Sequence, residues 1–368
     1  MQKRNSRILI AAGGTGGHLF PAISIAEQIK QREPGVEFLF VGAKGKIEEH
    51  AVPEHGYPFR PIWISGFARG LKARNILVPL KVFVAVMQSI ALIRNFKPHT
   101  VVGTGGFVTG PVLYAASLLH VPTLIQEQNS IPGFTTRRLA RRVNEVHVGF
   151  EGTIRFLKSA RNVKISGNPT RETLGTIERA KGVEFFHLNP RKKTLLVFGG
   201  SLGASSINRA VLGFAEELCR KGFQLIWQTG ERDCGKIKSD LASLSGVCIE
   251  KFIEKMEYAY AAADLVVCRA GAITLAELTR VGKAAILVPY PHAAAGHQLL
   301  NARTLVDAGG AALVLDHELV PALKDTVFGL LQDDRRREEM ARQSRSVGKP
   351  DAAKTIAEAV LRLARVTS

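Results

Sequence analysis

Two segments of this chain, half its length apart, share one pattern. Residues 7–15 read Arg-Ile-Leu-Ile-Ala-Ala-Gly-Gly-Thr, and residues 194–201 read Thr-Leu-Leu-Val-Phe-Gly-Gly-Ser. Each has a short apolar run followed by two glycines and a hydroxyl residue, and a segment with helical periodicity comes next. Doubly wound sheets bind ligands at the loops that follow their strands. The pattern therefore predicts two Rossmann-like α/β domains that face each other across a cleft.

The rest of the sequence favours the same architecture. Short apolar runs alternate with helical segments, which is typical of parallel sheets covered by helices. The expected strands are residues 7–11, 37–41, 100–102, 123–126, 145–148, 163–165, 194–198, 224–228, 247–249, 265–268, 285–288 and 311–315. A turn-rich segment at residues 167–171 indicates the boundary. We expect an N-terminal domain over residues 1–167, a C-terminal domain over 168–350, and a last helix within 351–368 that packs back on the first domain.

Positive charge is concentrated in the first half of the chain. Of 50 Lys and Arg and 32 Asp and Glu, the first 168 residues hold 22 basic and 9 acidic ones. The net charge of +18 is therefore divided into +13 in that part and +5 in the remainder. Such an excess attracts polyanions, which include nucleic acid, phosphorylated substrates and anionic membranes. Helix-turn-helix, zinc-finger and RRM signatures are missing from the sequence, so we expect no nucleic acid.

The N-terminus and the cysteines indicate a cytoplasmic protein. The apolar run Ile8–Ala12 is too short for a signal-peptide core, and no stretch reaches the roughly 20 uninterrupted apolar residues of a membrane span. The four cysteines form no C-x-x-C pair. We therefore expect reduced structural thiols and neither a zinc ribbon nor a redox motif.

Three glycine loops follow predicted strands. The first, residues 13–18 (Gly-Gly-Thr-Gly-Gly-His), precedes a helix that we expect Pro21 to open. It is not a dinucleotide fingerprint, which needs glycine where this chain has Leu19, and it lacks the Lys-Ser or Lys-Thr of a Walker A loop. The others are residues 103–107 and 199–203. Each alone is equally consistent with a tight turn, but together they predict more than one phosphate-bearing ligand.

A fourth motif also follows a predicted strand. Residues 269–277 (Arg-Ala-Gly-Ala-Ile-Thr-Leu-Ala-Glu) begin a helix. Its early amide groups and the Thr274 hydroxyl can receive a phosphate, while Glu277 can accept both hydroxyls of a ribose. Alternatively, Glu277 only complements the helix dipole. Gln298 and Asn301 begin the next helix, where they suit sugar hydroxyls and a capping role equally well.

Metal motifs are missing from the sequence. The chain contains no D-x-D, no H-E-x-x-H and no carboxylate cluster spaced to hold Mg²⁺ or Mn²⁺. We therefore expect no metal, and we expect helix ends and backbone amides to stabilise any bound diphosphate.

The segment at residues 76–93 predicts a membrane-binding surface. Ile76, Leu80, Phe83 and Met87 fall on one helical face. Basic residues surround it or lie elsewhere in the same half of the chain: Arg69, Lys72, Arg74, Lys81, Arg94, Lys97, Arg137, Arg138, Arg141 and Arg142. An apolar patch ringed by cations is typical of an interfacial site on an anionic membrane, where each cation contributes about 1 kcal/mol. A core helix is the alternative for the apolar part.

These motifs, in order over about residues 7–305, resemble those of the MurG family of bacterial N-acetylglucosaminyltransferases. The matching residues are 13–18 with Phe20, Pro21 and Ala22, then Gly105 and Gly106, 127–129, 167–171, 199–204 and 271–277. The resemblance implies a GT-B fold and a metal-independent, inverting hexosyltransferase without a cofactor. The family transfers N-acetylglucosamine from UDP-N-acetylglucosamine to the C4 hydroxyl of undecaprenyl-pyrophosphoryl-MurNAc-pentapeptide, which is the step from lipid I to lipid II in peptidoglycan synthesis.

The resemblance also implies a location and partners. It implies a peripheral protein on the cytoplasmic face of the bacterial inner membrane, bound to anionic lipids, within a cell-wall synthesis complex that serves cell shape, the cell cycle and cell division. Two other functions stay open. One is a UDP-N-acetylglucosamine 2-epimerase of the same fold, and the other is a non-catalytic basic protein that binds membrane or nucleic acid.

Carried over residue by residue, the family's roles fall on both domains. For the donor, Ile253 would contact the uracil through its backbone, Glu277 would bind the ribose, and Arg171 would lie nearby. The remaining contacts would be Ser201, Ala272, Ile273, Thr274, Leu275 and Ala276 for the diphosphate, Gln298 and Asn129 for the N-acetylglucosamine, and Thr15, Gly16 and Gly17 beside the acceptor. His18 would be the general base, because a neutral imidazole is well matched to take a proton near neutral pH, and Glu127 is the competing candidate.

The sequence departs from the family pattern in three places. Gln126 stands where His is usual, so we expect no base there, and Phe107 lacks the hydroxyl of the usual Tyr. Ala295 and Gly296 replace two acids, so no cap or sugar contact is expected from these positions.

Overall fold

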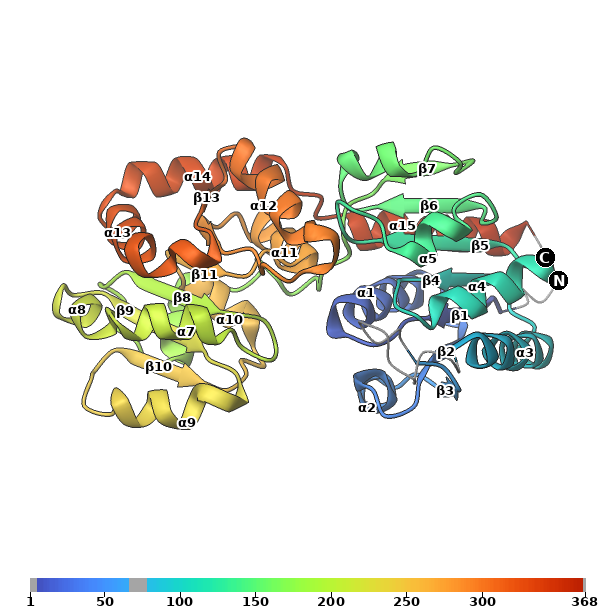
Figure 1. Ribbon diagram of the computed structural model, residues 1–368, viewed down its shortest axis with the longest axis horizontal. Coiled ribbons are helices and arrows are strands. Elements are labelled where there is room, and N and C mark those ends of the chain that lie inside the picture. The colour runs from blue at the N-terminus through green and yellow to red at the C-terminus, as the bar shows by residue number, and fades with distance from the viewer. Residues whose placement is uncertain (1–4, 66–77, 367–368) are drawn as a thin grey trace. The chain divides into compact units, whose positions relative to one another are not determined.

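The computed structural model describes residues 5–65 and 78–366, which form two compact units (Figure 1). The first comprises Met1–Thr170 together with Pro350–Ser368, and the second comprises Arg171–Lys349. The second unit thus begins three residues after the position expected from the sequence, and the C-terminal helix belongs to the first unit.

The first unit contains a parallel sheet that has seven strands among the described residues. Its strand order is β3-β2-β1-β4-β5-β6-β7. The strands are β1 (Arg7–Ala11), β2 (Glu37–Ala43), β3 (Phe59–Ile62), β4 (Thr100–Gly103), β5 (Thr123–Glu127), β6 (Glu145–Val148) and β7 (Val163–Ile165). In β1, Ile10 pairs with Phe40 on one side and Val102 on the other. Because the central strands are buried on both faces, they read as continuous apolar runs.

Helices cover both faces of this sheet. They are α1 (Gly16–Arg32), α2 (Ile47–Glu54), α3 (Val78–Phe96), α4 (Thr109–Leu118), α5 (Phe134–Leu139), the 3-10 helix η2 (Glu151–Phe156) and α15 (Ala352–Arg365). Successive β1 side chains point to opposite faces. Ile8 and Ile10 join a core with α1 and α15, whereas Leu9 and Ala11 join one with α3 and α4.

The C-terminal helix α15 lies against the sheet of the first unit, where it is the red helix in Figure 1. The Thr100 hydroxyl donates to the carbonyl of Val360 at 3.4 Å. Arg362 pairs with Glu145 on β6, and Arg32 on α1 pairs with the exposed Glu358 at 3.6 Å. The end of the chain is thus held by apolar packing and by ion pairs.

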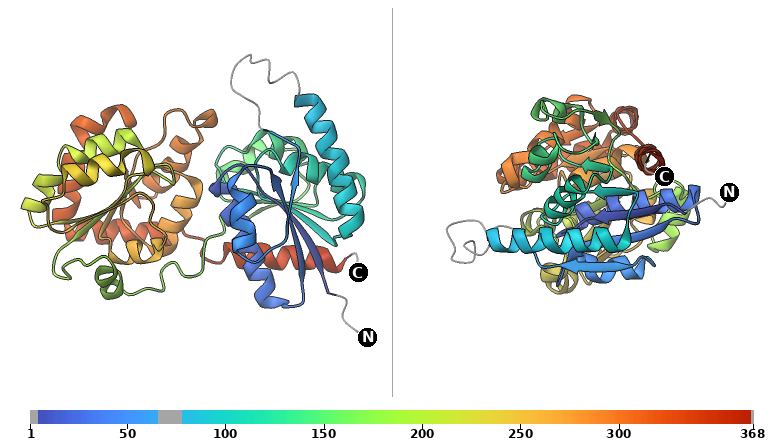
Figure 2. Two further views of the ribbon diagram at one scale, coloured as in Figure 1. Left: turned by 90° about the horizontal axis from the view of Figure 1, so that it is seen from below. Right: turned by 90° about the vertical axis from the view of Figure 1, so that its right-hand side faces the viewer.

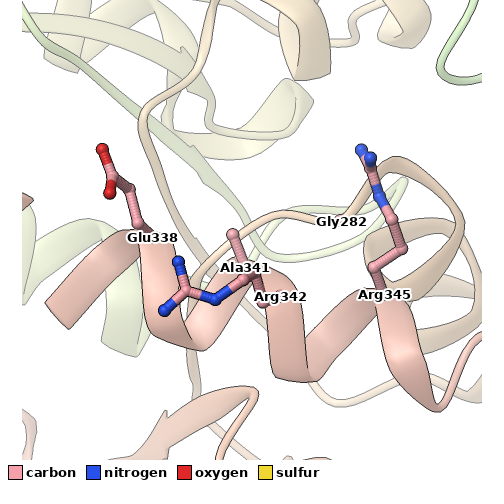
Figure 3. Close-up of a pocket in the computed structure, with 5 residues that line it drawn as sticks. All are labelled: Gly282, Glu338, Ala341, Arg342 and Arg345. Carbon is pink, nitrogen blue, oxygen red and sulfur yellow. The ribbon is translucent and has the colours of Figure 1, made fainter. Parts of the chain in front are cut away.

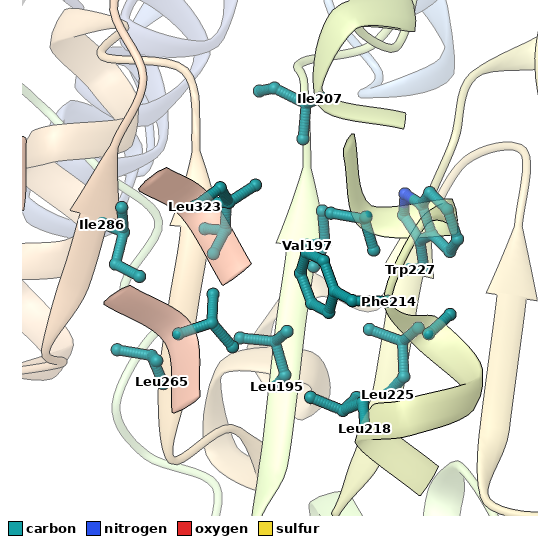
Figure 4. Close-up of a cluster of buried hydrophobic side chains, with 14 of the residues drawn as sticks. Leu195, Val197, Ile207, Phe214, Leu218, Leu225, Trp227, Leu265, Ile286 and Leu323 are labelled. Atoms are coloured by element: carbon teal, nitrogen blue, oxygen red, sulfur yellow. The ribbon is translucent and has the colours of Figure 1, made fainter. Parts of the chain in front are cut away.

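The second unit repeats the same strand order over six strands within the described part of the chain, β10-β9-β8-β11-β12-β13. They are β8 (Thr194–Phe198), β9 (Gln224–Gln228), β10 (Val247–Glu250), β11 (Leu265–Cys268), β12 (Ala285–Leu287) and β13 (Ala311–Leu313). Its helices are α6 (Arg179–Phe185), α7 (Ser205–Leu212), α8 (Ala215–Arg220), α9 (Glu231–Asp240), α10 (Met256–Ala262), α11 (Ala272–Val281), η3 (Ala294–Gly296), α12 (His297–Asp307), η4 (Asp316–Glu318), α13 (Leu319–Gln332) and α14 (Asp334–Ser346). Leu195 and Val197 of β8 belong to one buried cluster with Trp227 of β9, Ile207 of α7 and Leu323 of α13 (Figure 4).

The structure differs from the sequence-based expectations in two elements that bear on the site. Strand β3 was not predicted, because its pattern is broken by Pro61; it pairs only with β2, and an edge strand tolerates a residue without a backbone N–H. Helix α1 begins at Gly16 and not at Pro21, which lies inside it. The first glycine loop is therefore itself the start of the helix.

Candidate active site

The first glycine loop connects β1 to α1 and is held by a buried acid. Thr15 is the N-cap of α1, and Gly16 and Gly17 form its first residues. Both carboxylate oxygens of Glu48 lie 3.2 Å from the amide of Gly14, and Oε1 also accepts from the amide of Ala43 at 3.1 Å. Glu48 is fully buried. A carboxylate of the protein thus occupies one of the loop amides that could otherwise have met a phosphate.

The second glycine loop supports the first one. Gly105 and Gly106 both have positive φ, 108° and 80°. A Cβ at residue 105 would lie 2.5 Å from Nδ1 of His18, and one at residue 106 would collide with the carbonyl oxygen of Gly13. Close packing against the first loop explains both glycines, and the phosphate ligand expected at residues 103–107 stays a prediction.

His18 stands in the first turn of α1 with its side chain partly buried. Its Nδ1 lies 3.1 Å from Oε1 of Gln128, and its carbonyl accepts from the Thr104 hydroxyl at 2.8 Å. Among the described residues, Nε2 has no hydrogen-bond partner. A neutral imidazole with one ring nitrogen held and the other open can take a proton from a bound hydroxyl.

Glu127, the competing base, serves the local structure. It ends β5 and is 5% exposed. Oε1 accepts from the amide of Asn129 at 3.1 Å, and Oε2 accepts from the amide of Gly133 at 3.0 Å and from the Thr136 hydroxyl at 2.7 Å. Proton uptake would weaken all three bonds, so the geometry favours His18 as the base.

The other predicted residues of the first unit lie near these two. Thr15 and Gly17 are exposed, and Gly16 is partly exposed. The partly buried Asn129 directly follows Gln128, and its carbonyl accepts from the Thr153 hydroxyl at 3.0 Å. Thr15, Gly16 and Gly17, expected beside the acceptor, and Asn129, expected beside the N-acetylglucosamine, therefore have surfaces that a ligand can reach.

In the second unit, the glycine loop after β8 is open. Ser201 and Leu202 are exposed, the latter by 89%, and neither has a hydrogen-bond partner within the described residues. The position of the loop is fixed by a hydrogen bond, since the side-chain amide of Gln228 donates to the carbonyl of Gly200 at 2.9 Å. Backbone amides at this position remain available to an anion.

Gln228 also changes the expected role of Ile253. Its Oε1 accepts from the amide of Ile253 at 2.8 Å, and the Ile253 side chain is buried. The amide of Ile253 is thus already bonded, and its carbonyl is the backbone group that remains available to the uracil. Such a carbonyl can accept a hydrogen bond from an N–H of a uracil ring.

Helix α11 carries the predicted diphosphate and ribose contacts. Gly271 is its N-cap, and Ala272, Ile273 and Thr274 form its first turn, at the end of the helix toward which backbone amides point. Leu275 is buried, whereas Ala276 is partly exposed. The positive end of the helix dipole therefore lies at the residues expected to meet the diphosphate.

Glu277 stands about one turn into α11. The buried Tyr260 donates a hydrogen bond from its hydroxyl to Oε2 of Glu277 at 3.0 Å. Burial raises the pKa of the Glu277 carboxyl, and the Arg171 guanidinium and the Tyr260 hydroxyl partly offset that rise. One carboxylate oxygen is thus held in place while the other can accept from sugar hydroxyls.

Arg171 lies close enough to Glu277 to act on its charge and pairs with Glu257 at 3.7 Å. The segment that carries it is tied to α11, because Arg280 donates to the carbonyls of Leu174 at 3.1 Å and Glu172 at 3.4 Å. The structure thus brings together Arg171 and Glu277, two residues expected to bind the sugar-nucleotide donor, which lie more than a hundred positions apart in the sequence.

The two amides of α12 have different environments. Oε1 of Gln298 accepts from the amide of Tyr290 at 2.8 Å, so its NH₂ group is the part left for a sugar. Asn301 is fully buried and donates to the carbonyl of Ala270 at 3.4 Å. Asn301 therefore supports the loop before α11, while Gln298 keeps a donor. Ala295 and Gly296, which replace two acids, are exposed and have positive φ.

The sequence indicated no role for Arg269. In the structure its side chain contacts the segments that follow β8, β12 and β13. It pairs with Asp316 at 2.5 Å and donates to the Ser206 hydroxyl at 2.7 Å and to the carbonyl of Val288 at 3.2 Å. These partners follow β8, β12 and β13, so one side chain connects four strand ends. Nothing local in the sequence indicated this, because the partners lie 19 to 63 residues away.

A pocket in the second unit lies apart from these residues. It is lined by Gly282, Glu338, Ala341, Arg342 and Arg345 (Figure 3). Gly282 follows the C-terminal end of α11, and the ten residues of this helix place it about 15 Å from Ala272. The described residues contain no group of three or more His, Cys, Asp or Glu placed to hold a metal ion.

Comparison with known proteins identifies the family. Residues 8–148 match the glycosyltransferase family 28 N-terminal domain, and residues 194–356 match its C-terminal domain. Two proteins named UDP-N-acetylglucosamine–N-acetylmuramyl-(pentapeptide) pyrophosphoryl-undecaprenol N-acetylglucosamine transferase are similar over nearly the whole chain. That of Chlorobaculum parvum is 44% identical over 98% of this chain and 100% of its own, and that of Christiangramia forsetii is 39% identical over 98% of both.

Solved structures agree with this. The crystal structure of Acinetobacter baumannii MurG matches with a TM-score of 0.77 and 29% identity over 98% of this chain and all of its own. A UDP-GlcNAc 2-epimerase from Neisseria meningitidis matches with a TM-score of 0.67 but only 16% identity, over 97% of this chain and all of its own, so it supports the fold alone. The predicted GT-B fold of two Rossmann-like sheets is confirmed. The chain belongs to the MurG family of N-acetylglucosamine transferases within glycosyltransferase family 28.

Proposed function

We propose that this protein transfers N-acetylglucosamine from UDP-N-acetylglucosamine to the C4 hydroxyl of undecaprenyl-pyrophosphoryl-MurNAc-pentapeptide and so converts lipid I to lipid II in peptidoglycan synthesis. The observation that carries the proposal is the 38–44% identity, over nearly the full chain, to proteins named for this transfer. The epimerase alternative has only a likeness of fold, and a non-catalytic protein would not need the side chains described above.

The second unit would bind the donor. The exposed amides after Gly200 and the first turn of α11 would receive the diphosphate, and these fixed dipoles would also stabilise the charge on the departing UDP. Glu277 would accept the ribose hydroxyls with the oxygen that Tyr260 does not hold. The carbonyl of Ile253 would accept from the uracil, and the NH₂ group of Gln298 would donate to the sugar.

The first unit would supply the proton chemistry. Nε2 of His18 would remove the proton of the acceptor hydroxyl as its oxygen attacks the anomeric carbon from the side opposite the diphosphate. One new bond forms to the sugar carbon and the bond to the diphosphate oxygen breaks, so the configuration at that carbon inverts. General-base assistance of this kind accelerates reactions by about 10²- to 10⁴-fold.

An assay of the purified protein with radiolabelled UDP-N-acetylglucosamine and a lipid I analogue tests the proposal. We expect labelled disaccharide-lipid product, and we expect its rate to persist in excess EDTA. Release of free sugar and UDP without an acceptor would instead indicate the epimerase reaction. No product above background at any pH would refute the transfer.

The proposal includes a location at the cytoplasmic face of the inner membrane, supported by α3. By length and composition, α3 is the one helix among the described residues that could cross a membrane, a possibility that the sequence analysis had set aside. It lies along the sheet of the first unit (Figure 2), with Ala85, Ser89 and Ile93 buried. Only three residues separate its end from β4. A helix packed in this way offers a face to a membrane and does not leave the domain.

The opposite face of α3 is apolar and exposed. Leu80, Phe83 and Met87 are 53%, 63% and 51% exposed. Lys81 lies over the ring of Trp63, 5.6 Å from its centre, and Trp63 is itself half exposed. Exposed cations lie at the end of α3 and directly after it, and on α5, which adjoins α4, and directly after it: Arg94, Lys97, Arg137, Arg138, Arg141 and Arg142. Ile76, Arg69, Lys72 and Arg74, which we also expected at this surface, lie outside the described residues.

Charge substitution on α3 tests the membrane site. Phe83→Glu, alone or with Leu80→Glu, should reduce association with phosphatidylglycerol liposomes while activity on a water-soluble acceptor persists. Val320→Glu is the matched control, because Val320 is 77% exposed on a helix of the second unit. Equal liposome binding by all of these variants would refute the assignment.

A further inference from the structure

Three buried side-chain amides of the first unit form a closed hydrogen-bonded group next to His18. Gln126, Gln128 and Asn168 are at most 4% exposed. Gln128 Nε2 donates to the carbonyl of Thr104 at 2.5 Å and to Oε1 of Gln126. Gln126 Nε2 donates to Oδ1 of Asn168 at 2.9 Å, and Asn168 Nδ2 donates to the carbonyl of Gln128 at 3.0 Å.

Two backbone carbonyls determine the direction of every bond in this group. A carbonyl oxygen only accepts, so the atom of Gln128 that faces the carbonyl of Thr104 must be its NH₂ group. For the same reason the NH₂ group of Asn168 must face the carbonyl of Gln128. Oδ1 of Asn168 then faces Gln126 and requires its NH₂ group, which leaves the oxygen of Gln126 for Gln128. A flipped amide would place two acceptors against each other and leave a buried donor without its partner, which is unfavourable.

The consequence falls on His18. With its NH₂ group committed, Gln128 presents Oε1 to the imidazole, and Nδ1 of His18 lies 3.1 Å from that oxygen. An amide oxygen accepts, so Nδ1 must carry the proton in the neutral ring. Nε2 then holds the lone pair.

The surrounding backbone keeps the ring in this position. Thr104 is fully buried and contacts both partners, because its hydroxyl donates to the carbonyl of His18 at 2.8 Å while its own carbonyl accepts from Gln128. Gly105 leaves room for the imidazole, since a Cβ there would lie 2.5 Å from Nδ1. The ring therefore has little freedom to turn Nδ1 away from Gln128.

We propose that Gln128 is a positioning residue that fixes His18 in the Nδ1–H tautomer and so keeps Nε2 as the proton acceptor, with Gln126 and Asn168 fixing Gln128 in turn. This rests on the proposed function, in which His18 is the base. Gln126, the residue that departs from the family pattern, is the middle amide of the group. A neutral amide partner orients the ring without stabilising its protonated form as a carboxylate would.

NMR of the full-length protein labelled with ¹⁵N-histidine tests the tautomer without reference to activity. At a pH where the ring is neutral, we expect a protonated Nδ1 and an unprotonated Nε2 for His18, with the signal assigned by its loss in His18→Asn. Gln128→Leu should shift the population toward Nε2–H. A wild-type signal of the Nε2–H form would overturn the inference even if the transferase assay succeeds, and an inactive protein with the expected tautomer would refute only the proposed function.

Kinetics separate positioning from support of the fold. We expect Gln128→Leu to lower kcat about tenfold with KM for UDP-N-acetylglucosamine unchanged, the effect of about one hydrogen bond. Gln128→Glu keeps an acceptor opposite Nδ1 but loses the two bonds that the Gln128 NH₂ group donates, so it should recover only part of the kcat lost in Gln128→Leu and should move the acidic limb of the kcat profile to higher pH. Gln224→Leu is the matched control, because Gln224 is a buried amide of the second unit bonded to Asn189. A Gln128→Glu profile that coincides with that of the wild type, or an equal loss of kcat in Gln224→Leu, would contradict the proposal.

Discussion

The glycine loops after β1 (residues 13–18) and after β8 (residues 199–203) share one sequence pattern and one position in the sheet, but their hydrogen-bond partners differ. β1 and β8 hold equivalent positions in sheets of the same strand order. After β1, the carboxylate of the buried Glu48 bonds to the amide of Gly14. After β8, a neutral amide from Gln228 holds the carbonyl of Gly200, and Ser201 stays exposed.

The difference shows that a glycine loop does not by itself make a phosphate site. The Glu48 carboxylate already accepts from the amide of Gly14 in the loop after β1, whereas Ser201 and Leu202 in the loop after β8 are exposed and could receive an anion. The positive charge of the first half lies on its outer helices and not in its loop. We therefore propose that the first unit transfers the proton and that the second unit binds the UDP part of the donor.

The largest effect is expected for His18→Ala. Loss of the base should lower kcat by about 10²-fold or more, since general-base catalysis contributes 10²- to 10⁴-fold, while the Kd for UDP-N-acetylglucosamine stays the same. Steady-state kinetics and isothermal titration calorimetry measure the two quantities. Unchanged turnover would transfer the role to Glu127 or to solvent.

Glu277→Ala should have the complementary effect. It removes the charged acceptor for the ribose, so donor affinity should fall about 10- to 100-fold, as expected for hydrogen bonds to a charged group. His18-dependent chemistry at saturating donor should change much less. Glu184→Gln, an exposed carboxylate on α6, is the control. If Glu277→Ala and His18→Ala each changed kcat and Kd together, the division between the units would be lost.

Glu48→Ala tests the acid beneath the first loop. The amide of the buried Ala43 and that of the partly exposed Gly14 would lose their acceptor, so the free energy of unfolding should fall by about 1–3 kcal/mol, while donor affinity in the second unit is kept. Urea unfolding and calorimetry measure these. Glu49→Gln, one residue further along α2 and more exposed, should change stability by less than about 0.5 kcal/mol. A tighter donor complex in Glu48→Ala would show that the first loop does bind phosphate.

The smallest expected effect is a pH dependence of the first unit. His147 is buried, with Nε2 3.0 Å from Glu145 and Nδ1 2.6 Å from the Ser166 hydroxyl. Burial lowers the pKa of His147, and the hydrogen bond to Glu145 only partly offsets this. Burial would raise the pKa of Glu145, but hydrogen bonds from His147 and Lys164 and the charges of Lys164 and Arg362 hold it below its ordinary value.

The sign of the pH effect on stability follows from the lowered pKa values of His147 and Glu145. Each group has a lower pKa in the folded state than in the unfolded chain, so its contribution to stability is present at high pH and is lost as the pH falls. For His147 the loss begins below its ordinary value of 6.5. Thermal unfolding between pH 7.5 and 5.5 should therefore show a larger loss of stability in the wild type than in His147→Asn. Equal losses would contradict this account.

The sequence predicted the fold better at the centre of each sheet than at its edges. The central strands are buried on both faces and read as continuous apolar runs, so each of them was predicted with the correct first residue and with a last residue at most two positions off. Strand β3 was missed because an exposed edge needs neither a continuous apolar pattern nor every backbone N–H, which admits Pro61. The start of α1 was misplaced because the rule that proline opens helices does not apply to Pro21.

The candidate site divides in the same way. The start of α11 and the position of Glu277 one turn into it are local consequences of strand, turn and helix, and the sequence indicated both. The contacts between Glu48 and Gly14, and between Gln126 and Asn168, join residues 34 and 42 positions apart. No spacing within one element indicates such pairs.

By itself, the sequence determined the two parallel sheets, the glycine loops after β1 and β8, and the family that carries these motifs. These features can be predicted because the periodicity of apolar residues and the residue types of turns act over a few neighbouring positions. Only the tertiary structure decided what each loop can do. A hydrogen bond depends on which partner the fold brings within about 3 Å. In the first unit that partner is a carboxylate, which accepts from the amide of Gly14, and in the second it is a side-chain amide, which donates to the carbonyl of Gly200.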